Sequence, residues 1–263
     1  MGPAAEGLRP EELARQLLSL GVEPGGVLLV HTSFRALRPV DGGPGGVIVG
    51  LREALGPEGT LVMPSWSAER GPPFDPSRSE SAPDLGVVAS VFWKLPNVRR
   101  SDHPHAFAAI GPRATDVLRD PLPLPPHRPE SPVGRVHELD GQVLLLGVDH
   151  DADTTIHLAE VVGGAPYRVP KQCTILRDGR PFVIEYGEND HCCRRFKAVD
   201  DWLEGAGAQT RGPVGRAIAR LARSRDIVDV VVDRLASDPL VFLHEPDEGC
   251  ADCDEARATV PAA

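Results

Sequence analysis

The stretch that decides the fold is residues 142–160, which read QVLLLGVDHDADTTIHLAE. Its first part, Gln142 to Val148, is a continuous apolar run of the kind found in strands that are covered on both faces. Polar residues follow directly, and Asp153 or Thr154 can cap a helix that begins there. The pattern therefore predicts a buried strand, a loop and a helix, in an α/β protein.

The N-terminal part of the chain repeats a helix that is followed by a strand. Leucines at helical spacing in residues 10–20 predict a helix that Gly21 can end, and residues 27–30 form the apolar strand that follows. Residues 47–55 and 60–63 repeat this cycle. Two such units predict an α/β layer.

A hairpin is predicted after residue 165. Residues 173–176 and 182–186 are apolar and flank Asp178-Gly179, a dipeptide that favours a tight turn between strands. Asp226 can cap a later helix, and residues 240–243 read as a short strand. The expected fold is a layered α/β/α structure with a mixed central sheet and an added antiparallel hairpin, in one domain of residues 1–263.

Composition narrows the class of protein. The chain has 263 residues, 41% of them hydrophobic, so it can bury a sizeable core. Its formal net charge of −10 argues against binding to nucleic acid and is compatible with a polycationic ligand. No apolar run approaches the ~20 residues of a membrane span, and no signal-peptide pattern is present, so a cytoplasmic location is expected.

His157 is the leading catalytic candidate. It follows the carboxyl end of a predicted strand, where sites form in open α/β sheets, although a single histidine there can also be structural. Glu160 lies three residues on, nearly on the same helical face, and can orient the imidazole. Asp190, in a second polar cluster at residues 188–191, is either a helix cap or a further carboxylate for His157.

Residues 99–107 combine two arginines and two histidines before a strand of small residues. This segment is either a phosphate-binding loop or a solvated loop. Neither a P-loop nor a G-x-G-x-x-G motif occurs in the sequence, so a Walker or Rossmann nucleotide site is not supported.

Five cysteines are an odd number for a disulfide framework. Cys250 and Cys253 form a C-x-x-C pair, which has the spacing of one half of a zinc site. His191, Cys192 and Cys193 could supply the other half, with Cys193 and His191 the expected ligands, and the alternative is that these thiols are free. Cys173 lies in an apolar strand and is expected to be buried.

Four segments together resemble the aminoglycoside 3-N-acetyltransferases, and the similarity runs nearly from end to end. They are VLLVHTSF (27–34), VMPSWS (62–67), RSDHP (100–104) and TTIHLAE (154–160). ENDHCC (188–193), SRDIV (224–228) and GCADC (249–253) are most similar to the type IV branch, whose substrates include apramycin and gentamicin-like compounds.

The resemblance implies a fold distinct from the GNAT acetyltransferases and an acetyl-CoA-dependent N-acetylation of the 3-amino group of 2-deoxystreptamine, which gives antibiotic resistance. The family's base corresponds to His157, and its supporting carboxylates to Glu160 and Asp190. The residues expected on the CoA side are His31, Thr32, Ser33, Phe34, Arg35, Ser101, His103 and Phe107. Those available to the antibiotic are Trp66, Glu69, Asp75 and Asp153.

Two other classes remain open. A zinc-dependent hydrolase would use His150, His157 and Asp190 as metal ligands, although no H-E-x-x-H or similar compact zinc motif is present. A non-catalytic sugar-binding or polyamine-binding protein is the third reading, and CoA-dependent turnover would exclude it.

Overall fold

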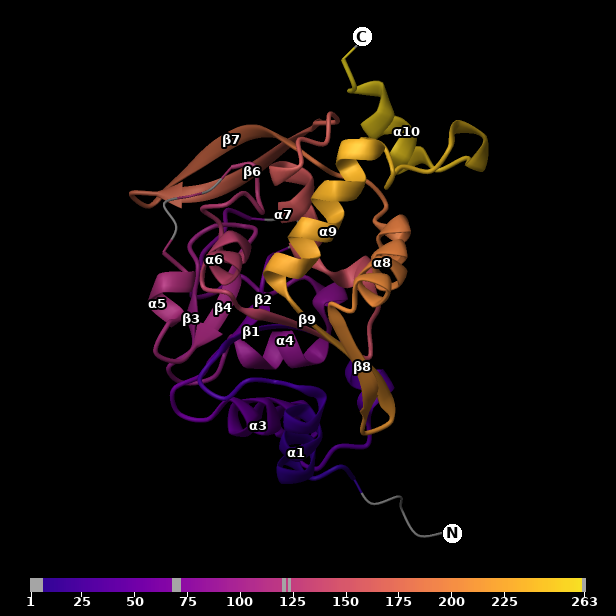
Figure 1. Ribbon diagram of the computed structural model, residues 1–263. Coiled ribbons are helices and arrows are strands. Elements are labelled where there is room, and N and C mark those ends of the chain that lie inside the picture. The colour runs from indigo at the N-terminus through magenta and orange to yellow at the C-terminus, as the bar shows by residue number, and fades with distance from the viewer. Residues whose placement is uncertain (1–6, 68–71, 120–121, 123, 262–263) are drawn as a thin grey trace, which may run out of the picture.

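Seven strands form the middle layer of the structure (Figure 1). The computed structural model describes residues 7–67, 72–119, 122 and 124–261. The strand order is β3-β4-β2-β1-β5-β9-β8, in which β1 is parallel to β2 and β5 and the remaining pairs are antiparallel. The strands are β1 (Val27–Thr32), β2 (Thr60–Pro64), β3 (Arg99–Arg100), β4 (Phe107–Ile110), β5 (Gln142–Leu146), β8 (Gln209–Val214) and β9 (Ala217–Arg223).

Helices cover both faces of this sheet, which is why its central strands are apolar on both sides. In β5, Leu144 and Leu146 pack into one core while Val143 and Leu145 pack into the other. The first core is covered by α1 (Pro10–Leu20), α2 (Phe34–Leu37), α3 (Gly43–Leu55) and α4 (Gly86–Phe92). The second is covered by α5 (Ala114–Val117), α6 (Pro132–Glu138), α7 (Thr154–Val162), α8 (Ala198–Ala206), α9 (Ser224–Ser237) and α10 (Ala251–Ala258).

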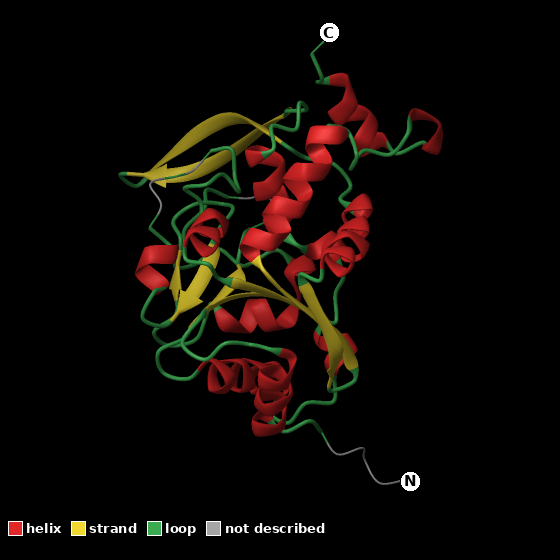
Figure 2. Cartoon of the chain, in the orientation of Figure 1, coloured by secondary structure: helices red, strands yellow, loops and turns green. Residues whose placement is uncertain are grey.

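The predicted hairpin forms a separate two-stranded sheet, made of β6 (Val169–Arg177) and β7 (Arg180–Glu188). It lies over the helical layer that contains α6 and α7 and does not extend the central sheet (Figures 1 and 2). Short 3-10 helices complete the described elements: η1 (Pro83–Leu85), η2 (His150–Ala152), η3 (Arg194–Lys197) and η4 (Pro246–Glu248). The layered α/β/α arrangement with a mixed sheet and an added hairpin is confirmed.

Two local predictions differ from the structure, and one pair of strands has no counterpart among the predictions. Residues 240–243 form turns rather than a strand, and Phe242 and Leu243 pack into the second core. The pair β8–β9 was not predicted. Asp226 lies in the first turn of α9, which begins at Ser224, so it does not occupy the cap position. Within the described part of the chain, no helix is both long and apolar enough to cross a bilayer.

Candidate active site

A cavity of about 760 Å³ opens at the carboxyl ends of β1 and β5. His31 and Thr32 end β1 and line it, and the loop and first turns after β5 contribute Asp153 and His157. The hairpin closes another side through residues of β6 and β7, among them Tyr186. The carboxyl ends of the parallel strands β1 and β5 therefore lie together at the cavity, which is where sites form in α/β sheets.

His157 lies at the start of α7, in an orientation that the helix N-terminus fixes. Asp153 is the N-cap, and its carboxylate accepts a hydrogen bond from the backbone N–H of Thr155 at 2.9 Å. Of the two residues predicted as the cap of this helix, Asp153 and Thr154, Asp153 is confirmed. Nδ1 of His157 lies 2.7 Å from Oε2 of Glu160, three residues further along the helix. The cap and the helical spacing together aim the imidazole into the cavity.

Glu160 is completely buried and is fixed by three partners. Besides His157, its carboxylate accepts a hydrogen bond from the hydroxyl of Tyr167, and its Oε1 lies 2.8 Å from Nε2 of His191. Burial alone would raise the pKa of Glu160, but the hydrogen bonds from His157 and His191 lower that pKa to about 2. Glu160 is therefore a carboxylate that orients His157.

The second nitrogen of His157, Nε2, lies 3.5 Å from Sγ of Cys193. Burial opposes the charged imidazole, but Cys193 and then Glu160 outweigh it, so the pKa of His157 is well above its ordinary value. The ring of His127 stacks on His157 at 5.2 Å between centroids. Burial, reinforced by the charge of His157, holds the pKa of His127 well below its usual range.

The prediction for Asp190 is wrong in its geometry. Its carboxylate lines the cavity but forms an ion pair with Lys171 of β6, and it is 41% exposed. The histidine beside it in sequence, His191, contacts Glu160 instead. The structure thus brings one of the two predicted carboxylates, Glu160, to His157.

The residues predicted for CoA fall in two places. His31 and Thr32 line the cavity, where burial lowers the pKa of His31 to about 4. Phe34 and Arg35 line a separate hollow of about 610 Å³. Ser33, between these two groups, donates its backbone N–H to the carbonyl of Leu146.

Of the second segment predicted for CoA, Ser101, His103 and Phe107 are buried and are not among the described residues that line the cavity. The Ser101 hydroxyl accepts a hydrogen bond from the Phe107 backbone N–H at 2.9 Å, and both residues are buried. Nδ1 of His103 accepts one from the backbone N–H of His105, and it is His105 that lines the cavity. These contacts give Ser101 and His103 a loop-fixing position.

The residues predicted for the antibiotic divide likewise. Trp66 and Asp153 line the cavity, and Trp66 packs edge-on against Phe107. Asp75 is not among the described residues that line the cavity. Its carboxylate accepts hydrogen bonds from the backbone N–H and the hydroxyl of Ser77. Glu69 lies outside the described residues.

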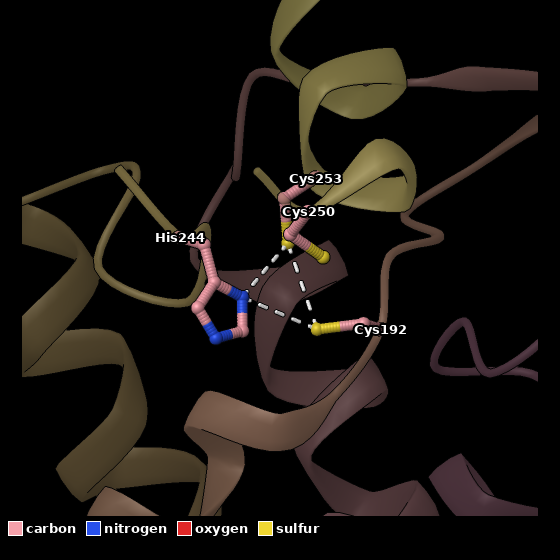
Figure 3. Close-up of side chains that lie close together, drawn as sticks. All are labelled: Cys192, His244, Cys250 and Cys253. Atoms are coloured by element: carbon pink, nitrogen blue, oxygen red, sulfur yellow. Dashed lines mark hydrogen bonds between the residues drawn. The ribbon is translucent and has the colours of Figure 1, made fainter. Parts of the chain in front are cut away.

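A cluster of three cysteines and one histidine lies beyond the cavity (Figure 3). Cys250 and Cys253 belong to it as predicted, but its other members are Cys192 and His244. The predicted ligands His191 and Cys193 point instead toward Glu160 and His157. The donor-atom separations are 3.3 Å from Cys192 Sγ to His244 Nδ1, 3.4 Å from that nitrogen to Cys253 Sγ, and 3.7 Å between the two sulfurs.

These separations fit a tetrahedral zinc site. With Zn–S bonds of about 2.3 Å and Zn–N bonds of about 2.0 Å, the edges of the tetrahedron are about 3.5–3.8 Å long. The donor set, three thiolates and one imidazole, is one that closed structural zinc sites use. His157, Glu160 and His191 also lie close enough to share an ion, but each histidine already forms a hydrogen bond with Glu160.

Sequence reasoning missed several residues that the tertiary structure makes important. His127 and Tyr186 line the cavity, Tyr167 holds Glu160, and His244 completes the cysteine cluster. For His244 a signal existed, because a histidine six residues before a C-x-x-C pair is a natural candidate for a third ligand. His127 sits in a proline-rich loop that offers no comparable pattern.

Comparison with known proteins shows the family of this chain. The profile of the family described as aminoglycoside 3-N-acetyltransferase matches residues 29–236. Aminoglycoside N(3)-acetyltransferase IV of Salmonella sp is 62% identical over 241 residues, which are 92% of each chain.

Two similar crystal structures are of a histidine-to-alanine variant of the type IVa aminoglycoside acetyltransferase. The complex with a gentamicin has a TM-score of 0.96 at 60% identity and covers 98% of this chain and 100% of that one. The complex with apramycin has a TM-score of 0.89 at 57% identity and covers 95% and 100%. Sequence and fold agree, and the chain belongs to the aminoglycoside 3-N-acetyltransferase family.

Proposed function

We propose that this protein transfers the acetyl group of acetyl-CoA to the 3-amino group of the 2-deoxystreptamine ring of aminoglycosides, gentamicin and apramycin among them, and thereby confers resistance. His157 is the general base. The observation that carries the proposal is the geometry of this residue: Nδ1 is held by the buried Glu160 at 2.7 Å, and the ring faces a cavity of about 760 Å³.

The chemistry requires such a pair. An amine attacks a thioester only as the neutral nitrogen, and the proton that it sheds on bond formation needs an acceptor. His157 accepts this proton at Nε2, and Glu160 stabilises the resulting imidazolium and fixes its orientation. Proton transfer of this kind contributes ~10²–10⁴-fold, and the positioning of amine and thioester in the cavity supplies much of the rest.

The character of the cavity suits a polycationic sugar. Asp84, Asp151 and Asp190 line it in addition to the buried Asp153, and Trp66 offers a flat apolar face for a sugar ring. Carboxylates at the mouth attract ammonium groups at a distance as well as on contact. CoA is proposed to approach from the side of His31 and Thr32, the cavity-lining residues of β1.

The first test is direct. The protein with acetyl-CoA and gentamicin or apramycin should release free CoA, which a thiol reagent detects. We expect His157→Ala to lower kcat by at least ~100-fold while the dissociation constants of both substrates stay within a factor of about three. Absence of CoA release across a panel of aminoglycosides would refute the function, and near-normal kcat of His157→Ala would refute the base.

We further propose that Cys192, His244, Cys250 and Cys253 hold one structural Zn²⁺. Four protein ligands would close the ion to substrates, so it would hold the C-terminal segment against the loop before η3. Elemental analysis should give one zinc per chain, and Co²⁺ in its place should give the intense visible bands of a tetrahedral thiolate site. A Cys250→Ala, Cys253→Ala variant that still holds one zinc would refute these ligands.

The hydrolase reading has no support in the described residues. His150 lies beside Asp153 and Gln209, and Asp190 forms its ion pair with Lys171, so the three proposed ligands are not brought together. Acetyl transfer should persist on brief exposure to a chelator, whereas a catalytic zinc would be lost with activity.

A further inference from the structure

Cys193 contacts His157, the proposed base, although the proposed acetylation of an amine does not require a thiol. Its Sγ lines the cavity and lies 3.5 Å from Nε2 of His157. On the far side of the same imidazole, Nδ1 lies 2.7 Å from Glu160. A thiol, an imidazole and a buried carboxylate thus stand in series, which is the order of nucleophile, base and orienting group in covalent acyl transfer.

The position of this thiol is fixed by its own turn. Cys193 has the left-handed backbone conformation, with φ of 56°, and its N–H donates to Nδ1 of His191 at 3.1 Å. Its Sγ also lies 3.3 Å from the carbonyl oxygen of His191. Phe196 packs edge-on against the ring of His157 with centroids 5.0 Å apart. These contacts hold Sγ at the nitrogen that the incoming amine must reach.

We propose that Cys193 is a second acetyl acceptor: when acetyl-CoA occupies the cavity and no aminoglycoside is present, the thiol of Cys193 takes the acetyl group. The inference rests on the proposed function, because it takes acetyl-CoA as the donor bound in this cavity. The amine and Sγ compete for one base, so a bound aminoglycoside suppresses the reaction.

The reaction balances without any other reactant. Sγ of Cys193 forms a bond to the carbonyl carbon of acetyl-CoA while its proton passes to Nε2 of His157. The carbon–sulfur bond to CoA then breaks, and the CoA sulfur takes that proton, leaving S-acetyl-Cys193 and free CoA. One thioester replaces another, so the yield follows the ratio of acetyl-CoA to CoA.

A second cysteine in the cavity, Cys173, serves as a control for Cys193. Cys173 of β6 also lines the cavity, but among the described residues no histidine nitrogen lies within hydrogen-bonding distance of its Sγ. Burial raises the pKa of this thiol. Acetyl-CoA that reaches both thiols should therefore modify Cys193 and leave Cys173 unmodified.

The experiment uses the full chain as purified, without exposure to a chelator. The protein is incubated with excess acetyl-CoA and no aminoglycoside, quenched in acid, and examined by intact-mass and peptide mass spectrometry. One acetyl group per chain is expected on the peptide that contains Cys193. Cys193→Ser and Cys193→Ala should lose it, Cys173→Ser should keep it, and His157→Ala should form it at least tenfold more slowly.

The outcomes separate the inference from the function on which it rests. An unmodified wild-type Cys193, or an equal thiol-bound acetyl group on Cys193→Ser, overturns the inference even when gentamicin is acetylated normally. Failure to acetylate any aminoglycoside overturns the proposed function in a separate assay. Because fragmentation of the peptide between the adjacent Cys192 and Cys193 assigns the acetyl group to one of them in the wild-type chain, the result stands even if a variant folds poorly.

Discussion

Glu160 is the residue on which the site converges. Its buried carboxylate accepts hydrogen bonds from Tyr167, His157 and His191, which come from three different parts of the chain. A buried carboxylate is costly unless its oxygens are satisfied, and here all three partners serve that need. The same contacts that make Glu160 tolerable in the core fix the direction of the base.

The pH dependence of turnover follows from His157. The proposed base acts only when it is neutral, so kcat/KM should rise with pH through the pKa of His157 in the free enzyme. This pKa lies well above its ordinary value because Cys193 and Glu160 favour the imidazolium against burial. We therefore expect the rising limb on the alkaline side of about pH 6.5, the ordinary pKa of histidine, measured as kcat/KM from about pH 5.5 to 9.5.

Glu160→Gln tests the cause of that shift. Without the carboxylate charge, the imidazolium is less stable, so the rising limb should move to lower pH while the maximal kcat falls by about 10–100-fold. Asp190→Asn is the matched comparison, since Asp190 forms its ion pair with Lys171 and not with His157. If the rising limb stays at the same pH in Glu160→Gln, Glu160 is not a cause of the raised pKa of His157.

At the scale of elements, the pair β8–β9 is tied to the rest of the molecule by Arg220. This side chain is 9% exposed, and its guanidinium lies 2.8 Å from Asp200 of α8 and 3.0 Å from Asp149 in the loop after β5. It therefore joins β9, the strand next to the edge strand β8, to a helix and to the loop that follows β5.

Removal of this arginine should destabilise the protein. Arg220→Ala leaves the carboxylate of Asp200 partly buried without its nearest cation, and we expect a loss of about 2 kcal/mol in the free energy of unfolding, measured in urea. Arg211→Ala is the control, because Arg211 is half exposed and 3.7 Å from the same carboxylate. Its loss should stay under about 0.5 kcal/mol.

Several elements could be predicted from local pattern. The helix at residues 10–20, the strands after residues 26 and 59, and the hairpin around Asp178-Gly179 all show their periodicity or turn chemistry in the sequence. β8 could not, because most of its residues are exposed or half exposed and it contains Gly212 and Pro213. Residues 240–243 were wrongly predicted as a strand, because the side chains of a short apolar run can be buried in a turn as well as in a strand.

At the scale of the whole molecule, the two ends of the fold differ in how they are held. α1 packs on α3 in one core, whereas α10 lies at the opposite end and is joined to the molecule by the cysteine cluster (Figures 1 and 3). Cys192 is flanked by His191 and Cys193, which contact Glu160 and His157. Zinc at this cluster would thus brace the turn behind the catalytic pair.

Removal of zinc should therefore cost stability. We expect a strong chelator to lower Tm by at least about 5 °C, measured by circular dichroism, because the ion binds the folded chain in preference to the unfolded one. The Cys250→Ala, Cys253→Ala variant, with no zinc to lose, should melt at the same temperature with and without chelator. An unchanged wild-type Tm after zinc loss, verified by elemental analysis, would contradict the bracing role.

By itself the sequence determined the layered α/β class, the helix that carries His157 and Glu160, and the likeness to the acetyltransferase family. All of these rest on periodicity, caps and motifs within short stretches. The tertiary structure decided that His191 and Cys193 contact Glu160 and His157, that Cys192 joins the cysteine cluster, and that Asp190 forms an ion pair with Lys171. Consecutive side chains leave the backbone in directions set by its dihedral angles and by packing against distant segments, and spacing along the chain records neither.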